Sequence, residues 1–553
     1  MKRYTFKTIT AVALIVATMT SCAKFDDMNR NPYAVYDAPA ESFVQPILYK
    51  TEYALVERTR DLVGELMQYS LNLSTEVTSQ MNYNYSITES TITSIWQNLY
   101  LQAGNAEYML DTARKEENPA MTGVALILKV LTMSSIADAY GNVPYFDAAR
   151  IALQNDKDLS YTTTYDEQEE IYKDLLRLLE EANRSFARAE QMVADGDLGS
   201  ADFSPLCDYM YDGDVQRWRR FGNSLYLRLL MRASLKVQEQ GGVIELGEEY
   251  GSLNVVNKIA EIYDCYLSGS GEYPVMRSQA DAALVGFSKT NSALYTPFYS
   301  TTSGIWNSMI ACSTIVDKMV NPDTGFEDPR FYYYFTKPLG APTQLLKSDL
   351  DKYMDGKISK AGNSLVGRYP RGASGQQNDL QNADHYALMN YSEQLFIFAE
   401  AGARGWLAMA YPAVKTLYLQ AVAESVSEWN DTVTAADEKV VKFLDTLASQ
   451  IDADNALETI MTQKWIATYW VGIESWCDYR RTGYPILKTN GPAADNNGIL
   501  PTRLRYPADE KYRNPKSYAE ATGGWLGGSD NMQTDVWWAS TAESRAMRLK
   551  GRK

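Results

Sequence analysis

Histidine is almost absent from this chain of 553 residues, and cysteine is scarce. The single histidine, His385, excludes metal sites that need several imidazole ligands, and any Ser/His/Asp mechanism would have to use it alone. Beyond the N-terminal region the four remaining cysteines are widely spaced and form no CxxC pair. That spacing favours buried free thiols over a disulfide framework or a zinc knuckle, so we expect neither a bound metal nor a cofactor.

Positive charge is also in deficit. Lys and Arg number 53 against 69 Asp and Glu, which gives a net charge of −16. The field of such an acidic protein repels phosphate backbones and anionic lipid heads, which argues against nucleic-acid partners and polybasic membrane attachment.

A long hydrophobic run is missing as well, because no segment of about eighteen uninterrupted apolar residues follows the N-terminal region. The composition does not exclude catalysis by Asp and Glu side chains.

The first residues have the pattern of a bacterial lipoprotein signal. Basic residues precede an apolar stretch at 9–19 that is too short to span a bilayer. Cys22 then follows two small residues where a signal peptide is cut, which resembles a lipobox. We expect a signal peptide at 1–21, acyl chains such as palmitate on Cys22, and an extended tether at 22–45. The alternative is an ordinary secretory signal with an incidental cysteine.

Helical periodicity dominates the mature chain. Asn118 and Pro119 supply an N-cap and a first-turn proline to one predicted helix, and Asp214 opens another. Further helices are predicted over about 166–188 and about 455–482, the second being the longest. Short breaker segments separate the helices, so stacked helical hairpins are expected.

The pattern divides one large domain at 46–553 into regions of different character. Gly, Ser, Pro and Tyr are abundant between about 266 and 388, where long periodic segments are rare. We predict a helical scaffold at 46–265 and 389–485, a loop-rich ligand-binding region at 266–388, and an irregular C-terminal region at 486–553.

Several motifs occur in one order along the chain. They are Asp138-Ala139-Tyr140-Gly141-Asn142-Val143-Pro144-Tyr145, then Gly213-Asp214 with Trp218, Phe221-Gly222-Asn223 and Arg228, then Gln463-Lys464-Trp465 through Glu474, Trp476 and Asp478-Tyr479-Arg480-Arg481-Thr482-Gly483, and finally Pro501-Thr502-Arg503, Tyr506-Pro507 and Trp537-Trp538. Together they resemble the SusD/RagB family of nutrient-binding outer-membrane lipoproteins, over nearly the whole mature chain.

This resemblance implies an all-α fold of TPR-like helical hairpins that carries an irregular, loop-rich ligand-binding face. It implies a lipid-anchored protein exposed at the outer membrane, which captures a glycan and acts as the lid of a SusC-type TonB-dependent transporter. Family members that bind peptides leave a peptide or another nutrient as an alternative ligand. The resemblance implies a binding protein and no enzyme.

Aromatic residues in loop-like sequence are the candidate ligand contacts, because a tyrosine or tryptophan presents an apolar face to a sugar and a polar edge to its hydroxyls. Tyrosine outnumbers phenylalanine by 39 to 15. Two clusters stand out, and their ring residues are Tyr83, Tyr85 and Trp96 in the first and Tyr295, Tyr299 and Trp306 in the second. Packing between helices is the alternative for each ring, and above all for Trp96 within a helix expected at 90–112.

Two further patterns have structural explanations. Glu474 and Asp478 lie four apart on one helix and could serve a helical glycoside hydrolase, but such a pair more often forms ion pairs with nearby arginines. The run from Arg330 to Tyr334 alternates like a short half-buried strand.

Overall fold

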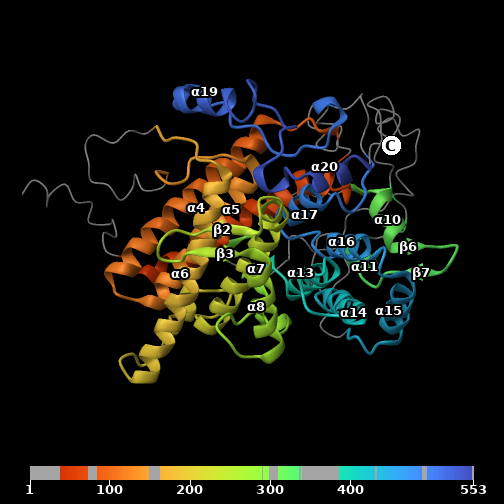
Figure 1. Cartoon of the computed structure of the whole chain (residues 1–553), viewed down its shortest axis with the longest axis horizontal. Coiled ribbons are helices and arrows are strands. Elements are labelled where there is room, and N and C mark those ends of the chain that lie inside the picture. Colours follow the sequence, from red (N-terminus) through yellow and green to blue (C-terminus); the bar gives the residue numbers. More distant parts are fainter. Residues whose placement is uncertain are drawn as a thin grey trace, which may run out of the picture.

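The computed structural model describes residues 38–72, 84–148, 162–288, 291–297, 309–335, 338, 340, 385–429, 433–488 and 495–550. Helices dominate these residues and the strands are short, which confirms the predicted fold class. Helices that follow one another in the chain pack side by side, notably α4 on α5, α5 on α6, α6 on α7 and α13 on α14. Figure 1 shows this order as a continuous change of colour across the molecule.

The first half of the chain contributes the longest helices. They are η1 (Ala40–Phe43), α2 (Val44–Arg58), η2 (Thr59–Val63), α3 (Gly64–Leu66), α4 (Glu89–Lys115), α5 (Pro119–Tyr140), α6 (Gln168–Asp195), η5 (Pro205–Cys207), α7 (Val215–Glu239) and α8 (Val255–Ser268). Helix formation begins at Ala40, within the segment expected as a tether.

The second half has shorter helices. They are η6 (Gln279–Asp281), η7 (Ser292–Leu294), α10 (Ser313–Met319), α11 (Phe331–Tyr334), α13 (Tyr391–Ala403), α14 (Tyr411–Ser427), α15 (Glu438–Gln450), α16 (Ala456–Ala467), α17 (Glu474–Thr482), η10 (Asn496–Gly498), α18 (Glu510–Arg513), α19 (Pro515–Gly523), η11 (Trp537–Ala539) and α20 (Ala542–Arg548).

The described strands form antiparallel pairs. They are β1 (Ser70–Asn72) with β5 (Met309–Ala311), β2 (Val243–Glu245) with β3 (Ser252–Asn254), β4 (Ala283–Gly286) with β8 (His385–Met389), and β6 (Val320–Asn321) with β7 (Phe326–Glu327). Two of these pairs join segments far apart in the sequence: β1 with β5 ties the loop-rich region to the N-terminal helices, and β4 with β8 joins the two ends of that region.

Side-chain caps start the helices where the sequence predicts. The Asn118 side chain accepts a hydrogen bond from the Met121 N–H at 3.0 Å, and Asp214 accepts one from the Arg217 N–H at 3.0 Å. Helix α5 is long and apolar enough to cross a membrane by length and composition alone, but 83% of its most apolar eighteen-residue stretch is buried inside the protein. It is therefore the central helix of the core.

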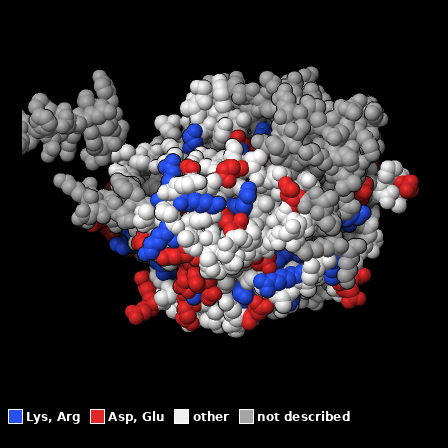
Figure 2. Space-filling view, turned by 90° about the horizontal axis from the view of Figure 1, so that it is seen from above, with Lys and Arg blue, Asp and Glu red and all other residues white. Residues whose placement is uncertain are grey.

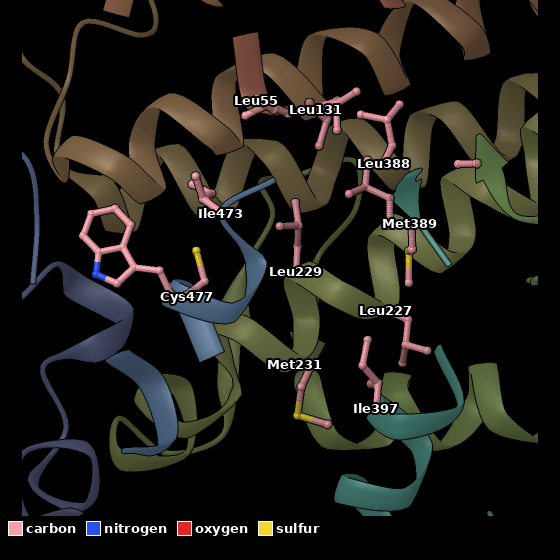
Figure 3. Packing of buried hydrophobic residues seen from close by; sticks show 14 of the residues in the cluster. Leu55, Leu131, Leu227, Leu229, Met231, Leu388, Met389, Ile397, Ile473 and Cys477 are labelled. Atoms are coloured by element: carbon pink, nitrogen blue, oxygen red, sulfur yellow. The ribbon is translucent and has the colours of Figure 1, made fainter. Parts of the chain in front are cut away.

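The core joins the two halves of the chain. Leu55 of α2, Leu131 of α5 and Leu229 of α7 meet Leu388 of β8 and Ile473 in one buried cluster. Figure 3 shows these side chains pointing into the space between their helices. Each fully buried side chain of this size contributes about 1.5–3 kcal/mol, so the cluster holds together segments more than four hundred positions apart.

Two sequence predictions on secondary structure were wrong. The expected helix over 455–482 is divided into α16 and α17, because Gly472 adopts a left-handed conformation with φ of 47°. The break lets the Gly472 carbonyl accept a hydrogen bond from the Thr59 hydroxyl at 2.8 Å. The expected strand ending at Tyr334 is the helical turn α11, whose preceding residue Arg330 is buried and pairs with Asp328 at 2.6 Å.

The core also contains an acidic side chain that has not been neutralised by an ion pair. Glu52 of α2 is fully buried, and neither of its carboxylate oxygens forms a hydrogen bond with a described residue. Burial raises the pKa of Glu52 to about 8 from an ordinary 4.5, although the charge of Arg228 lowers it. The native state therefore holds a proton on Glu52 at neutral pH.

We predict that Glu52→Gln stabilises the protein more at alkaline pH than at acidic pH. The pKa of Glu52 is higher in the folded than in the unfolded protein. The free energy of unfolding therefore falls as pH rises from about 4.5 to about 8. The amide removes this penalty, a relative gain on the order of 3 kcal/mol at pH 9 compared with pH 5.

Urea unfolding of both proteins at the two pH values measures this difference. The exposed Glu438→Gln is the matched control and should show no pH-dependent gain. An equal effect of Glu52→Gln at pH 5 and pH 9 would refute the assignment of a protonated native carboxyl.

Candidate functional site

A cleft of about 420 Å³ lies where the segment before α4 meets the C-terminal region. One wall is Tyr85, Ser86 and Ile87. The facing residues are Asp495, Asn496, Arg505, Asp530, Asn531 and Met532. The cleft therefore contains Tyr85 from the first predicted aromatic cluster.

Backbone contacts hold the two walls together. The Asn84 carbonyl accepts a hydrogen bond from the Asp495 N–H at 3.1 Å, and the Ile87 carbonyl accepts a long one from the Arg505 guanidinium at 3.4 Å. Tyr85 has a φ of 65°, a conformation that costs a bulky residue on the order of 1–3 kcal/mol. Its ring is only 2% exposed, so burial of the ring offsets that strain.

An ion pair holds the floor of the cleft. Asp530 accepts a hydrogen bond from Arg503 at 2.6 Å through one oxygen and from the Tyr506 N–H at 2.9 Å through the other. Arg503 is fully buried, and its guanidinium lies 4.4 Å from the centre of the Tyr506 ring. Both oxygens of Asp530 are thus engaged, which makes this carboxylate part of the framework.

Two charged side chains of the cleft remain open to a ligand. Among the described residues, no carboxylate oxygen lies within 4.0 Å of the Arg505 guanidinium, and its Nε is buried without a hydrogen bond. Asp495 is exposed, and its carboxylate accepts no hydrogen bond in the described part of the chain. The cleft therefore offers one strong donor and one strong acceptor beside the apolar Ile87 and Met532.

Such a lining suits a polyhydroxylated ligand. A sugar hydroxyl both donates and accepts, so a guanidinium and a carboxylate can bind neighbouring hydroxyls while the apolar side chains contact C–H groups. The amides of the cleft are less free, because Asn496 donates to the Ile499 carbonyl at 2.7 Å and Asn531 accepts from the Gln533 N–H at 2.8 Å.

The structure does not gather all of the predicted aromatic residues at this cleft. Tyr83, Tyr299 and Trp306 lie outside the described residues, as does Cys22. Tyr295 is half-buried, and its carbonyl accepts a hydrogen bond from the Tyr49 hydroxyl at 2.8 Å.

Trp96 is a core residue rather than a ligand contact. It lies within α4, is 9% exposed, and meets Tyr140 edge-on with ring centres 5.1 Å apart. A tryptophan in a helical stripe packs against neighbouring helices, which was the alternative explanation of this residue.

The charged residues of the cleft were missed from the sequence. Arg505 lies between Arg503 and Tyr506, two residues that contributed to the C-terminal family motif and were taken as scaffold. Two arginines within one short non-helical motif were the available signal. Whether each would be buried or open could not be deduced, because Arg503 pairs with Asp530 and not with Asp495, which lies nearer in the sequence.

Glu474 and Asp478 do not form a catalytic pair. They are 9% and 7% exposed, Glu474 forms an ion pair with Arg232, and Asp478 pairs with Lys464 at 2.7 Å. Burial alone would raise the pKa of Asp478, but Lys464 and Arg481 lower it below its ordinary value. The structure therefore contradicts a hydrolase based on these two carboxylates. The expected ion pair with a nearby arginine forms at Asp478, which pairs with Arg481 at 2.8 Å, whereas the partner of Glu474 is distant in sequence.

The four cysteines of the described region, Cys207, Cys265, Cys312 and Cys477, are free thiols, as predicted, but only Cys312 and Cys477 are buried. Lysine, arginine, aspartate and glutamate intermingle on the face seen from above in Figure 2, over the part that the structure describes.

Comparison with known proteins gives a family and a fold. The family model for SusD-like chains, described as "Starch-binding associating with outer membrane", matches residues 32–507. That description supports glycan binding and association with the outer membrane. No curated protein matches the sequence.

Solved structures resemble the chain over almost its whole length. A chitin-binding protein has a TM-score of 0.69 and 21% identity, covering 91% of this chain and 99% of its own. A chitin-binding SusD homolog from Flavobacterium johnsoniae has a TM-score of 0.67 and 20% identity, with coverages of 91% and 99%. A SusD homolog from Bacteroides uniformis has a TM-score of 0.68 and 23% identity, with coverages of 91% and 100%.

We predict that Asp530→Asn destabilises the protein by on the order of 2–4 kcal/mol, because it leaves the buried Arg503 guanidinium without its counter-charge. The matched control is Asp509→Asn, whose ion pair with Arg513 is exposed on both sides and should contribute less than about 0.5 kcal/mol. Chemical denaturation measures both. Equal effects of the two substitutions would show that Asp530 does not hold the floor of the cleft.

Proposed function

Because the chain belongs to the SusD-like family, we propose that it is a cell-surface glycan-binding lipoprotein. In this proposal it captures an oligosaccharide or polysaccharide and acts as the lid of a SusC-type TonB-dependent transporter. The cleft between residues 84–87 and the C-terminal region contacts the glycan. The assignment of this site rests on one observation: Arg505 and Asp495 are both available to a ligand in a partly apolar cleft.

The charges of the cleft favour binding without turnover. Glycoside hydrolysis commonly uses two carboxyl groups, one on each side of the scissile bond. In the described cleft, Asp530 is committed to Arg503, which leaves Asp495 as the one carboxylate open to a ligand. A single carboxylate and a guanidinium can orient hydroxyl groups, which is the task of a carrier.

The family description and the chitin-binding neighbours support glycan as the ligand class. A peptide is the alternative, because Arg505 and Asp495 would also bind a carboxylate and an ammonium group. We further propose that Tyr83, Tyr295, Tyr299 and Trp306 contact the ligand; Tyr85, whose ring is buried, lines the cleft. Trp96 is left out because it is buried in the core.

Attachment through Cys22 completes the proposal. Several acyl chains bury enough methylene groups to anchor a protein stably, at about 0.8 kcal/mol for each buried CH₂ group. The acidic residues Asp26 and Asp27 that follow fit an export signal to the cell surface.

Calorimetric titration with chitohexaose, maltohexaose and a charged hexapeptide tests the ligand. We expect a hexasaccharide to bind and release no new reducing ends. Arg505→Gln and Asp495→Asn should each weaken binding about 5- to 30-fold, the loss of one or two charge-assisted hydrogen bonds. The control Arg513→Gln removes an exposed arginine of α18 and should leave affinity unchanged.

Binding of the peptide alone would favour the alternative ligand class. Glycan affinity that is indifferent to both cleft substitutions would refute the assigned site, and turnover of the sugar would refute the carrier.

Membrane fractionation tests the anchor. Cys22→Ala should release the protein from the outer-membrane fraction, whereas the control Cys265→Ala should leave it there. Gentle detergent extraction of the wild type should recover a large outer-membrane barrel with it. Retention of the Cys22→Ala protein in carbonate-washed membranes would contradict lipid attachment.

A further inference from the structure

A second cleft, of about 370 Å³, lies between α6, the β2–β3 hairpin and the start of α8. It shares no residue with the cleft at Arg505. Figure 1 shows α8 at the lower part of the molecule, away from the blue α19 at the top. We propose that this second cleft is an additional binding site for neutral glycans, an inference that rests on the proposed function.

The hairpin supplies a firm apolar wall. Its strands pair Ile244 with Leu253, and Leu246 and Leu253 are buried against the body of the protein. Asn254 ends the hairpin and caps α8 by accepting a hydrogen bond from the Asn257 N–H at 2.9 Å. The wall is therefore continuous with the start of α8.

A buried carboxylate fixes the aromatic floor. Glu180 is 6% exposed and accepts hydrogen bonds from the Tyr226 hydroxyl at 2.7 Å and the Tyr273 hydroxyl at 2.8 Å. Lys258 donates to the same Tyr273 hydroxyl at 2.8 Å and lies 4.0 Å from the centre of its ring. Because these contacts hold the floor in place, binding a ligand would require little further ordering of the protein's side chains.

The rim carries groups able to contact hydroxyls. The guanidinium of Arg184 lies 4.2 Å from the centre of the half-buried Tyr250 ring, and the Arg184 side chain remains 50% exposed. Asn257 is exposed, and its side-chain amide forms no hydrogen bond with the residues that the structure describes. An arginine, a tyrosine and an amide side by side provide donors, an acceptor and an apolar surface.

The charge balance selects a neutral ligand. Lys258 pairs with Glu261 at 2.8 Å and with Glu180 at 3.4 Å, and Arg184 has Glu249 at 3.7 Å. No cation of the described cleft is left without a carboxylate, so an acidic sugar would find no unbalanced positive charge. A neutral chain of sugar residues can instead use the polar edges of the rim.

Two such sites would act together on a polymer. A shallow polar cleft binds a short oligosaccharide weakly, but a second point of attachment makes rebinding of the same polysaccharide intramolecular and raises its retention. The second cleft would therefore affect polymers more than hexasaccharides.

Affinity electrophoresis through gels that contain glycol chitin, soluble starch or laminarin tests the proposal. For the polymer that retards the wild type, Tyr250→Ala and Asn257→Ala should each reduce retardation at least about threefold. The affinity of the Arg505 cleft for the matching hexasaccharide, measured by calorimetry, should stay unchanged in both variants. Arg505→Gln should keep residual retardation, and Arg505→Gln combined with Tyr250→Ala should lose it. Tyr512→Ala, at an 83% exposed tyrosine, is the control.

The outcomes separate this inference from the proposed function. If Tyr250→Ala and the structurally milder Asn257→Ala both migrate like the control, the second site is refuted while glycan binding stands. Complete loss of retardation in Arg505→Gln alone would likewise refute the second site and leave glycan binding in place. If none of the polymers retards the wild type, the proposed function fails and the second site fails with it.

Discussion

Pairing of buried charges is the constraint on which this structure depends. Arg232 of α7 is 3% exposed and forms ion pairs with Asp138 at the end of α5 and with Glu474 at the start of α17. A charge in such surroundings is tolerated only with its partners, and loss of one partner costs about 3–5 kcal/mol. These ion pairs connect the three helices inside the core.

The same charged cluster positions the candidate site. Arg480 donates hydrogen bonds to the carbonyls of Asp138 at 2.6 Å and Thr502 at 3.1 Å, which ties the C-terminal segment to the end of α5. The Leu504 N–H extends this attachment by donating to the Ala139 carbonyl at 2.8 Å. Gly141 ends α5 with a φ of 89°, and a Cβ there would overlap the Trp525 ring. Arg505 thus projects from a segment held on both sides.

The sequence was sufficient for the scaffold and insufficient for the site. Caps such as Asn118 and Asp214 act locally, so the helices they begin could be predicted from neighbouring residues. The break at Gly472 lets its carbonyl accept a hydrogen bond from Thr59, more than four hundred positions away, a contact that no local pattern reveals. Tyr85 was singled out because rings and amides cluster near it in the sequence, and it lines the cleft although its ring is buried. Arg505 and Asp495 were not found, because their freedom depends on which distant carboxylates the fold gives to other arginines.

The central claim is that an intact glycan lies in the cleft between Arg505 and Asp495. A crystal structure of the protein grown with chitohexaose or maltohexaose tests it most directly. The account predicts an uncleaved oligosaccharide whose hydroxyls lie within hydrogen-bond distance of both side chains. A sugar bound only elsewhere, or a cleaved product in the cleft, would contradict it.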